Sequence, residues 1–294
     1  MVTSVSGPSA PSDPSPPQPL STSRGSTAAT SNPRTTASPA SSTNGAVPAR
    51  RAGYTRLTRT AQRARCDVGW RSPPPPHPRN TETMRVDIWS DLVCPWCYIG
   101  TTRFHRALED FEHRDRVEVV YRSFELDPTR EPGRTEPVTR MLTDRYGPQG
   151  AGMDDQVAEL ARADGLGYRT DREVGSTLDA HRLLHLAARH GLQRRLLAAL
   201  FEGHFAEGAS LFTPEALVGF AERVGLDPDE ARRVLHDPDA YLEPVRADEQ
   251  EAARLGAGGV PFFVVDGRYG VSGAQPVETF ARALRAAWDE RERG

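Results

Sequence analysis

The 294-residue sequence contains only three cysteines, no lysine, and no apolar run near the roughly 18 residues that a membrane-spanning helix requires. The missing run excludes a membrane-spanning protein. The scarcity of cysteine excludes a small secreted scaffold held together by disulfides. All 37 basic residues are arginine, and we interpret this bias as GC-rich codon usage rather than as a functional signal.

Aromatic residues are absent from the first 53 positions, and Ser, Thr, Pro and Ala fill 35 of the first 50. Residues 1–83 carry ten arginines against three acids, a net charge of +7, whereas residues 84–294 carry 27 arginines against 37 acids, a net charge of −10. A segment with so few apolar side chains does not bury enough surface to offset the entropy lost on ordering. We therefore predict that residues 1–83 form a disordered low-complexity leader.

The leader lacks the apolar core of a secretory signal peptide, which argues against export. Its Arg-rich, Ser-rich and acid-poor composition matches an organelle transit peptide, and the arginines between Arg50 and Arg65 are alternatively suited to contact polyanions. We favour a passive tail or a start codon assigned too far upstream, because a strand-like segment begins directly at Met84. Finding residues 1–83 in the intact mass of the natural protein would contradict the upstream start.

Regular patterns begin after the leader. Residues 84–89 alternate apolar and polar side chains and predict a short strand. A Cys-Pro-Trp-Cys motif at residues 94–97 follows, and the apolar spacing beyond it predicts a helix over residues 95–112. β-Branched and aromatic residues predict a second strand over residues 117–124. The helical crossover makes the two strands parallel neighbours in a β-α-β unit.

Helical patterns fill residues 127–255 without a strand signal or a fixed repeat, which predicts a single all-helical insertion. Strand character returns at residues 262–265 and 269–272, on either side of an Asp-Gly turn, and a final helix is expected over residues 276–291. Helix starts are expected at Thr213-Pro214 and Asp227–Glu230, and helix stops at Gly165, Gly191 and Gly225.

This order of elements predicts an α/β protein with the thioredoxin fold and an all-helical domain inserted after the second strand. Residues 84–126 and 256–294 form the two parts of the thioredoxin fold, and residues 127–255 form the insertion.

The spacing of Cys94 and Cys97 at a helix start is typical of a redox-active pair. The two sulfurs can form a disulfide, and the first is exposed to the positive end of the helix dipole, which stabilises a thiolate. We expect Cys94 to attack a substrate disulfide and Cys97 to resolve the mixed disulfide. A zinc site needs about four ligands, and the only other thiol, Cys66, lies in the leader, where we interpret it as a bystander. An inert pair is the remaining alternative.

A Gly-Gly-Val-Pro-Phe sequence at residues 258–262 immediately precedes the third strand. A proline at this position is by itself a weak signal, since only about 5–6% of X-Pro bonds in folded proteins are cis. In a thioredoxin topology, however, this loop faces the cysteine pair, and a cis bond exposes the preceding backbone to an extended substrate. We predict a cis Val260–Pro261 bond and a substrate-binding role for both residues.

Three segments resemble the FrnE-like branch of the DsbA family: SDLVCPWCYIG at Ser90–Gly100, LDAHRLLHLA at Leu178–Ala187, and GVPFFVVDGRYGVSGAQP at Gly259–Pro276. The resemblance covers the chain from Met84 to Arg291. It implies a cytosolic dithiol–disulfide oxidoreductase with Cys94 as nucleophile, Cys97 as resolving thiol and a cis-proline loop. It also implies a thioredoxin fold that carries a helical insertion.

The same superfamily includes 2-hydroxychromene-2-carboxylate isomerase and kappa-class glutathione transferases, which are similar in fold but use a serine at or near the first cysteine position. This chain retains both thiols. That difference favours disulfide exchange and leaves glutathione open as the redox partner.

Side chains around the motif are weaker candidates. Trp96 and Tyr98 are expected to shape an apolar rim around the sulfur, with Trp96 contacting substrate. The resemblance places the Asp-Ala-His-Arg-Leu motif in the insertion, so Asp179 and His181 are candidates for lining a substrate pocket above the cysteines. His181 and His185 share a helix face, but no third metal ligand is recognisable and we expect no metal.

Two acids flank the cysteine motif in the predicted fold. A carboxylate near a thiol raises its pKa and, if buried, can accept its proton. Asp91 and Glu125 are candidates for that role. We favour the simpler reading, in which Asp91 caps the helix and Glu125 is an exposed acid at a strand end.

The leading functional hypothesis is a cytoplasmic dithiol–disulfide oxidoreductase or isomerase acting on a disulfide-containing protein or a small thiol, with no bound cofactor. The alternatives are a glutathione-dependent isomerase or transferase acting on a small aromatic substrate, and a non-catalytic thioredoxin-fold binding module. We expect no membrane partner. The acidic charge of residues 84–294 disfavours nucleic-acid binding by the folded part.

Overall fold

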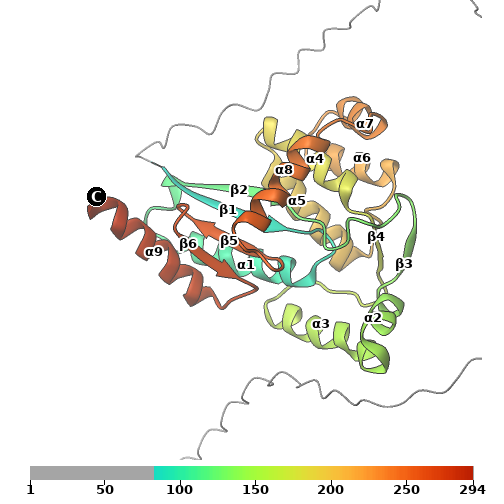
Figure 1. Ribbon diagram of the computed structural model, residues 1–294, viewed down its shortest axis with the longest axis horizontal. Helices are drawn as coiled ribbons and strands as arrows, with labels where there is room; N and C mark the ends of the chain where they lie inside the picture. Colours follow the sequence, from blue (N-terminus) through green and yellow to red (C-terminus); the bar gives the residue numbers. More distant parts are fainter. Residues whose placement is uncertain (1–82, 294) are drawn as a thin grey trace, which may run out of the picture. The chain divides into compact units, whose positions relative to one another are not determined.

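The computed structural model describes residues 83–293, so the predicted leader lies outside the described residues. A four-stranded sheet of order β2-β1-β5-β6 organises the fold (Figure 1). β1 (Met84–Ser90) pairs in parallel with β2 (Val117–Ser123). The antiparallel hairpin of β5 (Phe262–Val265) and β6 (Tyr269–Ser272) joins the other edge of β1. The predicted β-α-β unit and the returning hairpin are therefore confirmed.

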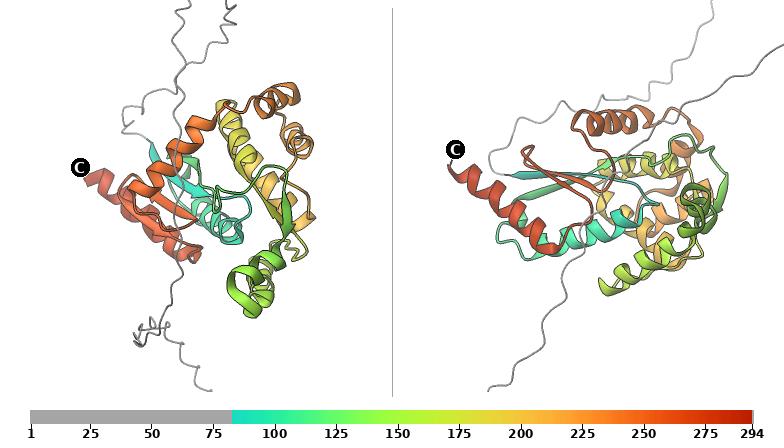
Figure 2. Two further views of the ribbon diagram at one scale, coloured as in Figure 1. Left: turned by 45° about the vertical axis from the view of Figure 1, so that its right-hand side comes forward. Right: turned by 60° about the horizontal axis from the view of Figure 1, so that its bottom comes forward.

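Helices cover both faces of this sheet. α1 (Pro95–Glu109) and α9 (Val277–Arg293) pack together on one face, and α8 (Leu242–Arg254) lies on the other, as the right-hand view of Figure 2 shows. Trp89 of β1 faces α8, where its Nε1 donates a hydrogen bond of 2.8 Å to the carbonyl of Asp248. Because successive side chains of a strand point to opposite faces, β1 contributes to both apolar layers.

Aromatic rings form the centre of the main core. Phe263 of β5 packs against Phe280 of α9 and Phe104 of α1, with ring centroids 4.6 Å and 5.5 Å apart. The same core continues into the insertion, because Tyr98 of α1 stacks on Phe205 at 5.0 Å. The sheet part and the insertion thus share one apolar interior.

The helical insertion lies between β2 and β5. It comprises α2 (Val138–Tyr146), α3 (Met153–Ala163), α4 (Leu178–Arg189), α5 (Gln193–Phe201), α6 (Pro214–Arg223), α7 (Pro228–His236) and α8, with a π-helical segment at Glu202–Glu207. None of the helices between residues 83 and 293 combines the length and the apolar character needed to cross a membrane.

The helix starts and stops predicted in the insertion are confirmed, by capping hydrogen bonds at the starts and by left-handed glycines at the stops. The Thr213 hydroxyl accepts a hydrogen bond from the Ala216 N–H, and the Asp227 carboxylate accepts one from the Asp229 N–H. The three expected stops all adopt the left-handed conformation that favours glycine, with φ of 73° at Gly165, 69° at Gly191 and 89° at Gly225.

The prediction that the insertion contains no strands is wrong. β3 (Thr135–Pro137) and β4 (Glu173–Gly175) form an antiparallel ribbon there, with Thr135 opposite Gly175. Each strand has only three residues, which is too short for a visible alternation of apolar and polar side chains. Their pairing depends on a contact between distant segments that local patterns do not encode.

Candidate active site

Both cysteines of the motif lie at the start of α1 as free thiols. Cys94 is the N-cap residue, and its extended backbone (φ −83°, ψ 111°) lets Pro95 begin the helix without needing an N–H partner. Cys94 is 3% exposed and Cys97 is completely buried. Trp96 between them is 41% exposed. Cys94 therefore lies at the N-terminal end of α1, where the first backbone N–H groups and the positive end of the helix dipole are directed toward it.

Cys97 lies in an environment that favours the neutral thiol. Burial raises its pKa well above the usual value, and the hydrogen bond and the charge of Cys94 raise it further. The Ser90 hydroxyl and the Asp91 N–H, which is 3.5 Å from the Cys97 sulfur, act in the opposite direction. At neutral pH Cys97 therefore carries its proton.

The predicted cis bond between Val260 and Pro261 is confirmed. The Cys94 thiol donates a hydrogen bond of 3.6 Å to the Val260 carbonyl, so the loop and the first sulfur are in contact. Gly100 of α1 makes this approach possible, because a Cβ there would lie 2.8 Å from Pro261 Cγ and 3.2 Å from Ala274 Cα. No local sequence signal marks Gly100 for this role, because the role depends on a loop about 160 residues away.

The insertion surrounds the other side of the cysteines with buried polar groups. Arg172 of the insertion is fully buried and pairs with Asp154 at 2.6 Å. Its guanidinium also stacks over the rings of Tyr168 and Phe205. Burial raises the pKa of Tyr168, and Cys94 is among the charges that act on it, so Tyr168 lies within electrostatic reach of the first sulfur. Sequence reasoning missed this cluster, because its members lie in separate helices and loops.

The two candidates of the Asp-Ala-His-Arg-Leu motif have different surroundings. Asp179 binds Arg182 at 2.6 Å, and Arg182 in turn donates to the carbonyl of Ala240. Asp179 is thereby part of the packing within the insertion. His181 is buried and directs its Nε2 to the carboxylate of Asp91, 3.5 Å away. Of the two, the structure brings only His181 to a residue that contacts Cys97.

His185 lies one turn further along α4, within 3.1 Å of the Ser123 hydroxyl and 3.2 Å of the Asp248 carboxylate. It therefore packs against the end of β2 and α8. Among residues 83–293, no group of three or more His, Cys, Asp and Glu side chains is placed to hold a metal ion.

The readings of Asp91 as a helix cap and of Glu125 as an exposed acid are wrong. The side chain of Asp91 is 2% exposed and accepts the Leu126 N–H at 2.7 Å, and α1 has no side-chain cap. Glu125 is also 2% exposed at its side chain and pairs with Arg246. Burial raises the pKa of Glu125, and the Arg246 hydrogen bond opposes this.

The register of the parallel strands explains both corrections. Ser90 lies opposite Ser123, so the residues that follow β1 and β2 meet at the same edge of the sheet. The chain beyond β2 then crosses the turn that contains Asp91 and covers it. The matched ends of the two predicted strands contained this information, and applying it would have placed Asp91 next to residues 124–126.

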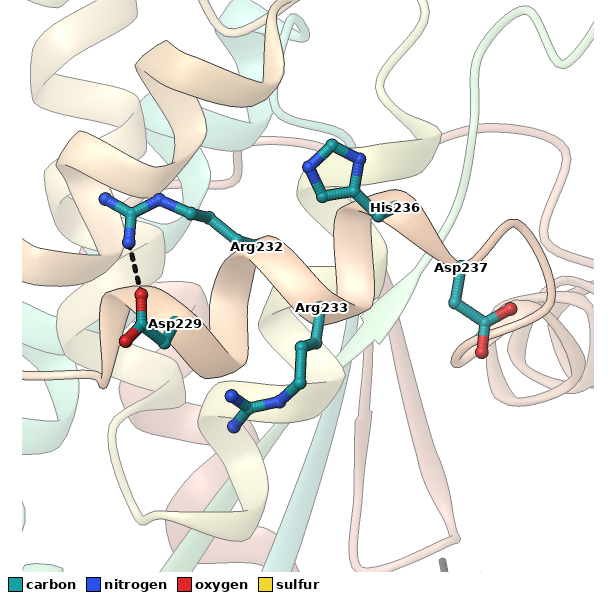
Figure 3. A pocket seen from close by; sticks show the side chains of 5 residues that line it. All are labelled: Asp229, Arg232, Arg233, His236 and Asp237. Carbon is teal, nitrogen blue, oxygen red and sulfur yellow. Dashed lines mark hydrogen bonds and ion pairs between the residues drawn. The ribbon is translucent and has the colours of Figure 1, made fainter. Parts of the chain in front are cut away.

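Two surface pockets lie away from the sulfurs. A hollow of about 540 Å³ on α7 is lined by Asp229, Arg232, Arg233, His236 and Asp237. In Figure 3 the exposed Arg232 side chain points to Asp229 and pairs with it, whereas Arg233, His236 and Asp237 point in other directions. A smaller pocket of about 260 Å³ between α1 and α5 is lined partly by Tyr98 and Phe201. Neither pocket includes a cysteine.

Comparisons with known proteins agree with this geometry. The family model of the DSBA-like thioredoxin domain matches residues 85–285. A probable DsbA oxidoreductase from Streptomyces coelicolor is 56% identical, with a TM-score of 0.68, and the match covers 70% of this chain and 91% of that one. The uncharacterized protein YwbO of Bacillus subtilis is 25% identical over 209 residues, which cover 69% of this chain and 96% of that protein.

Two more distant structures share the fold. The cytosolic disulfide reductase DsbM from Pseudomonas aeruginosa, solved with glutathione, is 20% identical with a TM-score of 0.50, and the match covers 70% of this chain and 99% of that one. A 2-hydroxychromene-2-carboxylate isomerase is 13% identical with a TM-score of 0.53, covering 71% and 99%. The match over residues 85–285, together with the cysteine pair at the start of α1, places this chain in the DSBA-like thioredoxin domain family and supports a thiol–disulfide oxidoreductase in general.

Proposed function

We propose that this protein catalyses dithiol–disulfide exchange through Cys94 and Cys97. The observation that carries the proposal is the position of Cys94, which lies at the start of α1 within 3.6 Å of the Val260 carbonyl. Cys94 lies at the positive end of the dipole of α1 and beside the proline loop, whereas burial raises the pKa of Cys97 and keeps it protonated. The two sulfurs are thereby suited to different halves of one reaction.

The reaction proceeds in two displacements. The Cys94 thiolate attacks one sulfur of a substrate disulfide, forms a mixed disulfide, and releases the other substrate sulfur as a thiolate. Cys97 then gives up its proton and attacks Cys94, which releases the second substrate sulfur and leaves a disulfide between Cys94 and Cys97. A dithiol reductant restores the pair to two thiols, and the reverse sequence oxidises a substrate dithiol.

The loop before β5 supports an extended polypeptide as substrate. The Val260 carbonyl lies beside Cys94, and a backbone segment bound there brings its own sulfur to the attacking thiol. Trp96 is exposed next to the same sulfur and offers an apolar contact. Asp179 is not proposed as a substrate contact, because its carboxylate is engaged by Arg182.

We propose glutathione as the redox partner and the cytoplasm as the compartment. The support is the shared fold with a cytosolic disulfide reductase solved with glutathione. In a reducing compartment, such a pair runs mainly as a reductase or isomerase.

A glutathione-dependent isomerase is the second candidate. The pocket between α1 and α5 favours it, because Tyr98 and Phe201 give apolar walls that suit a small aromatic substrate, and Arg194 and Glu202 are charged groups of the same lining. This pocket does not contain Cys94, so the two candidate functions use different surfaces.

Reduction of insulin by dithiothreitol, followed by turbidity, tests the leading proposal. We expect the full chain to accelerate precipitation, Cys94→Ser to abolish the acceleration, and Cys97→Ser to alter it. Cys66→Ser is the matched control, since it removes the third thiol of the chain and leaves the pair intact. Equal activity of a Cys94→Ala/Cys97→Ala double variant would contradict the proposal and would favour the isomerase or a binding module.

A further inference from the structure

The loop before β5 is supported by a second loop, residues 273–276, which connects β6 to α9 and which we call the β6–α9 loop. The Gly273 N–H donates a hydrogen bond of 2.8 Å to the Pro261 carbonyl. The preceding carbonyl, that of Val260, is the one that contacts the Cys94 thiol. The position of the backbone beside Cys94 therefore depends on the β6–α9 loop.

Two residues of α1 contact this support. Gly100 and Arg103 are three positions apart and so lie on the same side of the helix. A Cβ at Gly100 would lie 2.8 Å from Pro261 Cγ and 3.2 Å from Ala274 Cα, so both loops pass close to the helix there. Nη1 of Arg103 donates a hydrogen bond of 2.8 Å to the Ala274 carbonyl. Gly100 thus allows the close approach, and Arg103 binds the β6–α9 loop to the helix.

The insertion anchors the side chain of Arg103. Asp164 is the C-cap residue of α3, and its Oδ2 accepts Nε of Arg103 at 2.8 Å and pairs with Nη2 at 2.7 Å. The two side chains are only 20% and 15% exposed. Because a guanidinium is planar and presents its donors in a fixed fork, this pairing directs Nη1 toward the Ala274 carbonyl. A single side chain therefore connects the insertion to the β6–α9 loop.

Arg106 binds the same carboxylate without reaching the loop. It lies three residues further along α1, where its Nη1 is 3.3 Å from Oδ1 of Asp164 and its Nη2 donates to the Asp164 carbonyl. Within residues 83–293, none of the side-chain hydrogen bonds of Arg106 is with the β6–α9 loop. Of the two arginines that bind Asp164, only Arg103 joins it to that loop.

We propose that Arg103 is a positioning residue for polypeptide substrates, which holds the loop before β5 at Cys94 from an anchor on the insertion. This role rests on the proposed function and extends it, because Arg103 acts through the Ala274 carbonyl and not on a sulfur. A polypeptide backbone that binds beside Val260 requires that loop in a fixed place, whereas a small disulfide needs only the thiol. Loss of Arg103 should therefore weaken polypeptide binding and leave the reaction of Cys94 itself unchanged.

Kinetics with a polypeptide and with a small disulfide separate these effects, in a Cys66→Ser background of the full chain. Reduction of insulin by dithiothreitol over a range of insulin concentrations gives kcat and KM. Reaction of the reduced protein with 5,5′-dithiobis(2-nitrobenzoate) gives the rate of Cys94 attack. We expect Arg103→Met to raise the KM for insulin at least about fivefold, because a hydrogen bond from a charged donor is worth about tenfold or more. Both kcat and the rate with the small disulfide should stay within about twofold.

Arg106→Met is the matched control, since it removes an ion pair from the same carboxylate and leaves the contact with Ala274 intact. It should keep the KM for insulin within about twofold. Asp164→Ala provides a second variant, which removes the anchor and leaves Arg103 in place. It should raise the KM for insulin in the same direction as Arg103→Met.

Hydrogen exchange of the β6–α9 loop, measured by mass spectrometry, gives a readout that does not depend on activity. The Gly273 N–H should exchange at least about fivefold faster in Arg103→Met, because the loop that carries this donor is no longer bound to α1. In Arg106→Met the exchange of the same peptide should be unchanged.

An unchanged KM for insulin in Arg103→Met, an equal rise in Arg106→Met, or a parallel fall in the rate with the small disulfide would overturn the inference. A merely structural role would appear as a lower melting temperature with an unchanged KM, because the folded fraction enters kcat and not KM. Failure of the proposed function looks different: the wild-type protein would reduce insulin no faster than a Cys94→Ala/Cys97→Ala variant. The substrate role of Arg103 would then fall with it, although exchange at Gly273 would still respond to Arg103→Met.

Discussion

The two sides of the cysteine pair are built differently. On the strand side, the start of α1 and the loop before β5 place backbone groups and small residues against Cys94, with Gly100 allowing the close approach to Pro261. On the insertion side the polar groups are buried charges and histidines: His181 faces Asp91 beside the motif, and Arg172 packs on Tyr168, which lies within electrostatic reach of Cys94. The strand side therefore determines how closely the proline loop and a substrate approach Cys94. The insertion side supplies the buried charged groups near the pair.

This difference separates the effects that mutations should have. Changes on the insertion side should act mainly on stability and on its pH dependence, because they leave buried charges unpaired. Changes on the strand side should act mainly on the approach of substrate to Cys94.

The largest expected effect is on the buried ion pair of the insertion. Arg172→Met leaves the buried carboxylate of Asp154 without its charged partner and with the Tyr168 hydroxyl as a donor, which we expect to lower the free energy of unfolding by about 3–5 kcal/mol. Urea denaturation measures the change. Arg232→Met is the control, because its pair with Asp229 is exposed and should be worth at most about 1 kcal/mol. Similar losses in the two variants would contradict the contrast between buried and exposed pairs.

The next effect is the pH dependence of stability at His204. Its pKa is lowered to about 3 by burial and by Arg172, so between that value and about 6.5 the unfolded chain binds a proton that the folded chain does not. Stability should therefore fall as the pH drops through this window, with a slope of up to about 1.4 kcal/mol per pH unit from this group. His204→Gln should remove that part of the slope, whereas the exposed His236→Gln should retain it. Urea denaturation at a series of pH values provides the measurement, and an unchanged slope in His204→Gln would be the contrary result.

On the strand side, Gly100→Ala should push α1 away from the proline loop. The added Cβ lies 2.8 Å from Pro261 Cγ, and overpacking of this kind costs about 1–3 kcal/mol. The rate of Cys94 attack on a small disulfide should fall as well. Gly219→Ala is the matched control, since nothing lies within 4 Å of a Cβ at this position in α6, and alanine there should stabilise the helix by up to about 1 kcal/mol. If both variants behave alike in thermal melting and in attack rate, the close packing of α1 against Pro261 contributes neither to stability nor to the reactivity of Cys94.

The smallest effect should come from the exposed rim. Trp96→Ala should raise the KM for a protein substrate about fivefold, equivalent to about 1 kcal/mol of binding, with little change in thermal stability. Leu160→Ala removes another exposed apolar side chain, 43% exposed on α3, and should leave KM unchanged. Equal KM values for the wild-type protein and Trp96→Ala would remove Trp96 from the substrate site.

The strand side of the pair could be predicted from the sequence, whereas most of the insertion side could not. The cysteine pair at a strand–helix junction and the loop at Pro261 are encoded by short local patterns, and the structure places both as predicted. The surroundings of Asp91 and Glu125 depend on how the chain after β2 crosses the end of β1 and on how α4 docks against it. The contact of Asp91 with Leu126 follows from the matched ends of the two predicted strands. The contacts of Asp91 with His181 and of Glu125 with Arg246 join residues about 90 and 121 positions apart, and no local pattern encodes them. The three-residue strands β3 and β4 escaped prediction for the same reason.

Trapping of the mixed disulfide tests the central claim most directly. Cys97→Ser in a Cys66→Ser background, incubated with oxidised glutathione, should accumulate one glutathione per chain, mapped by mass spectrometry of the peptides to Cys94. The corresponding Cys94→Ser protein should accumulate little, because the buried thiol of Cys97 stays protonated and enclosed. Equal labelling of the two variants, or labelling of Cys97 in preference to Cys94, would contradict the assignment of Cys94 as the attacking thiol.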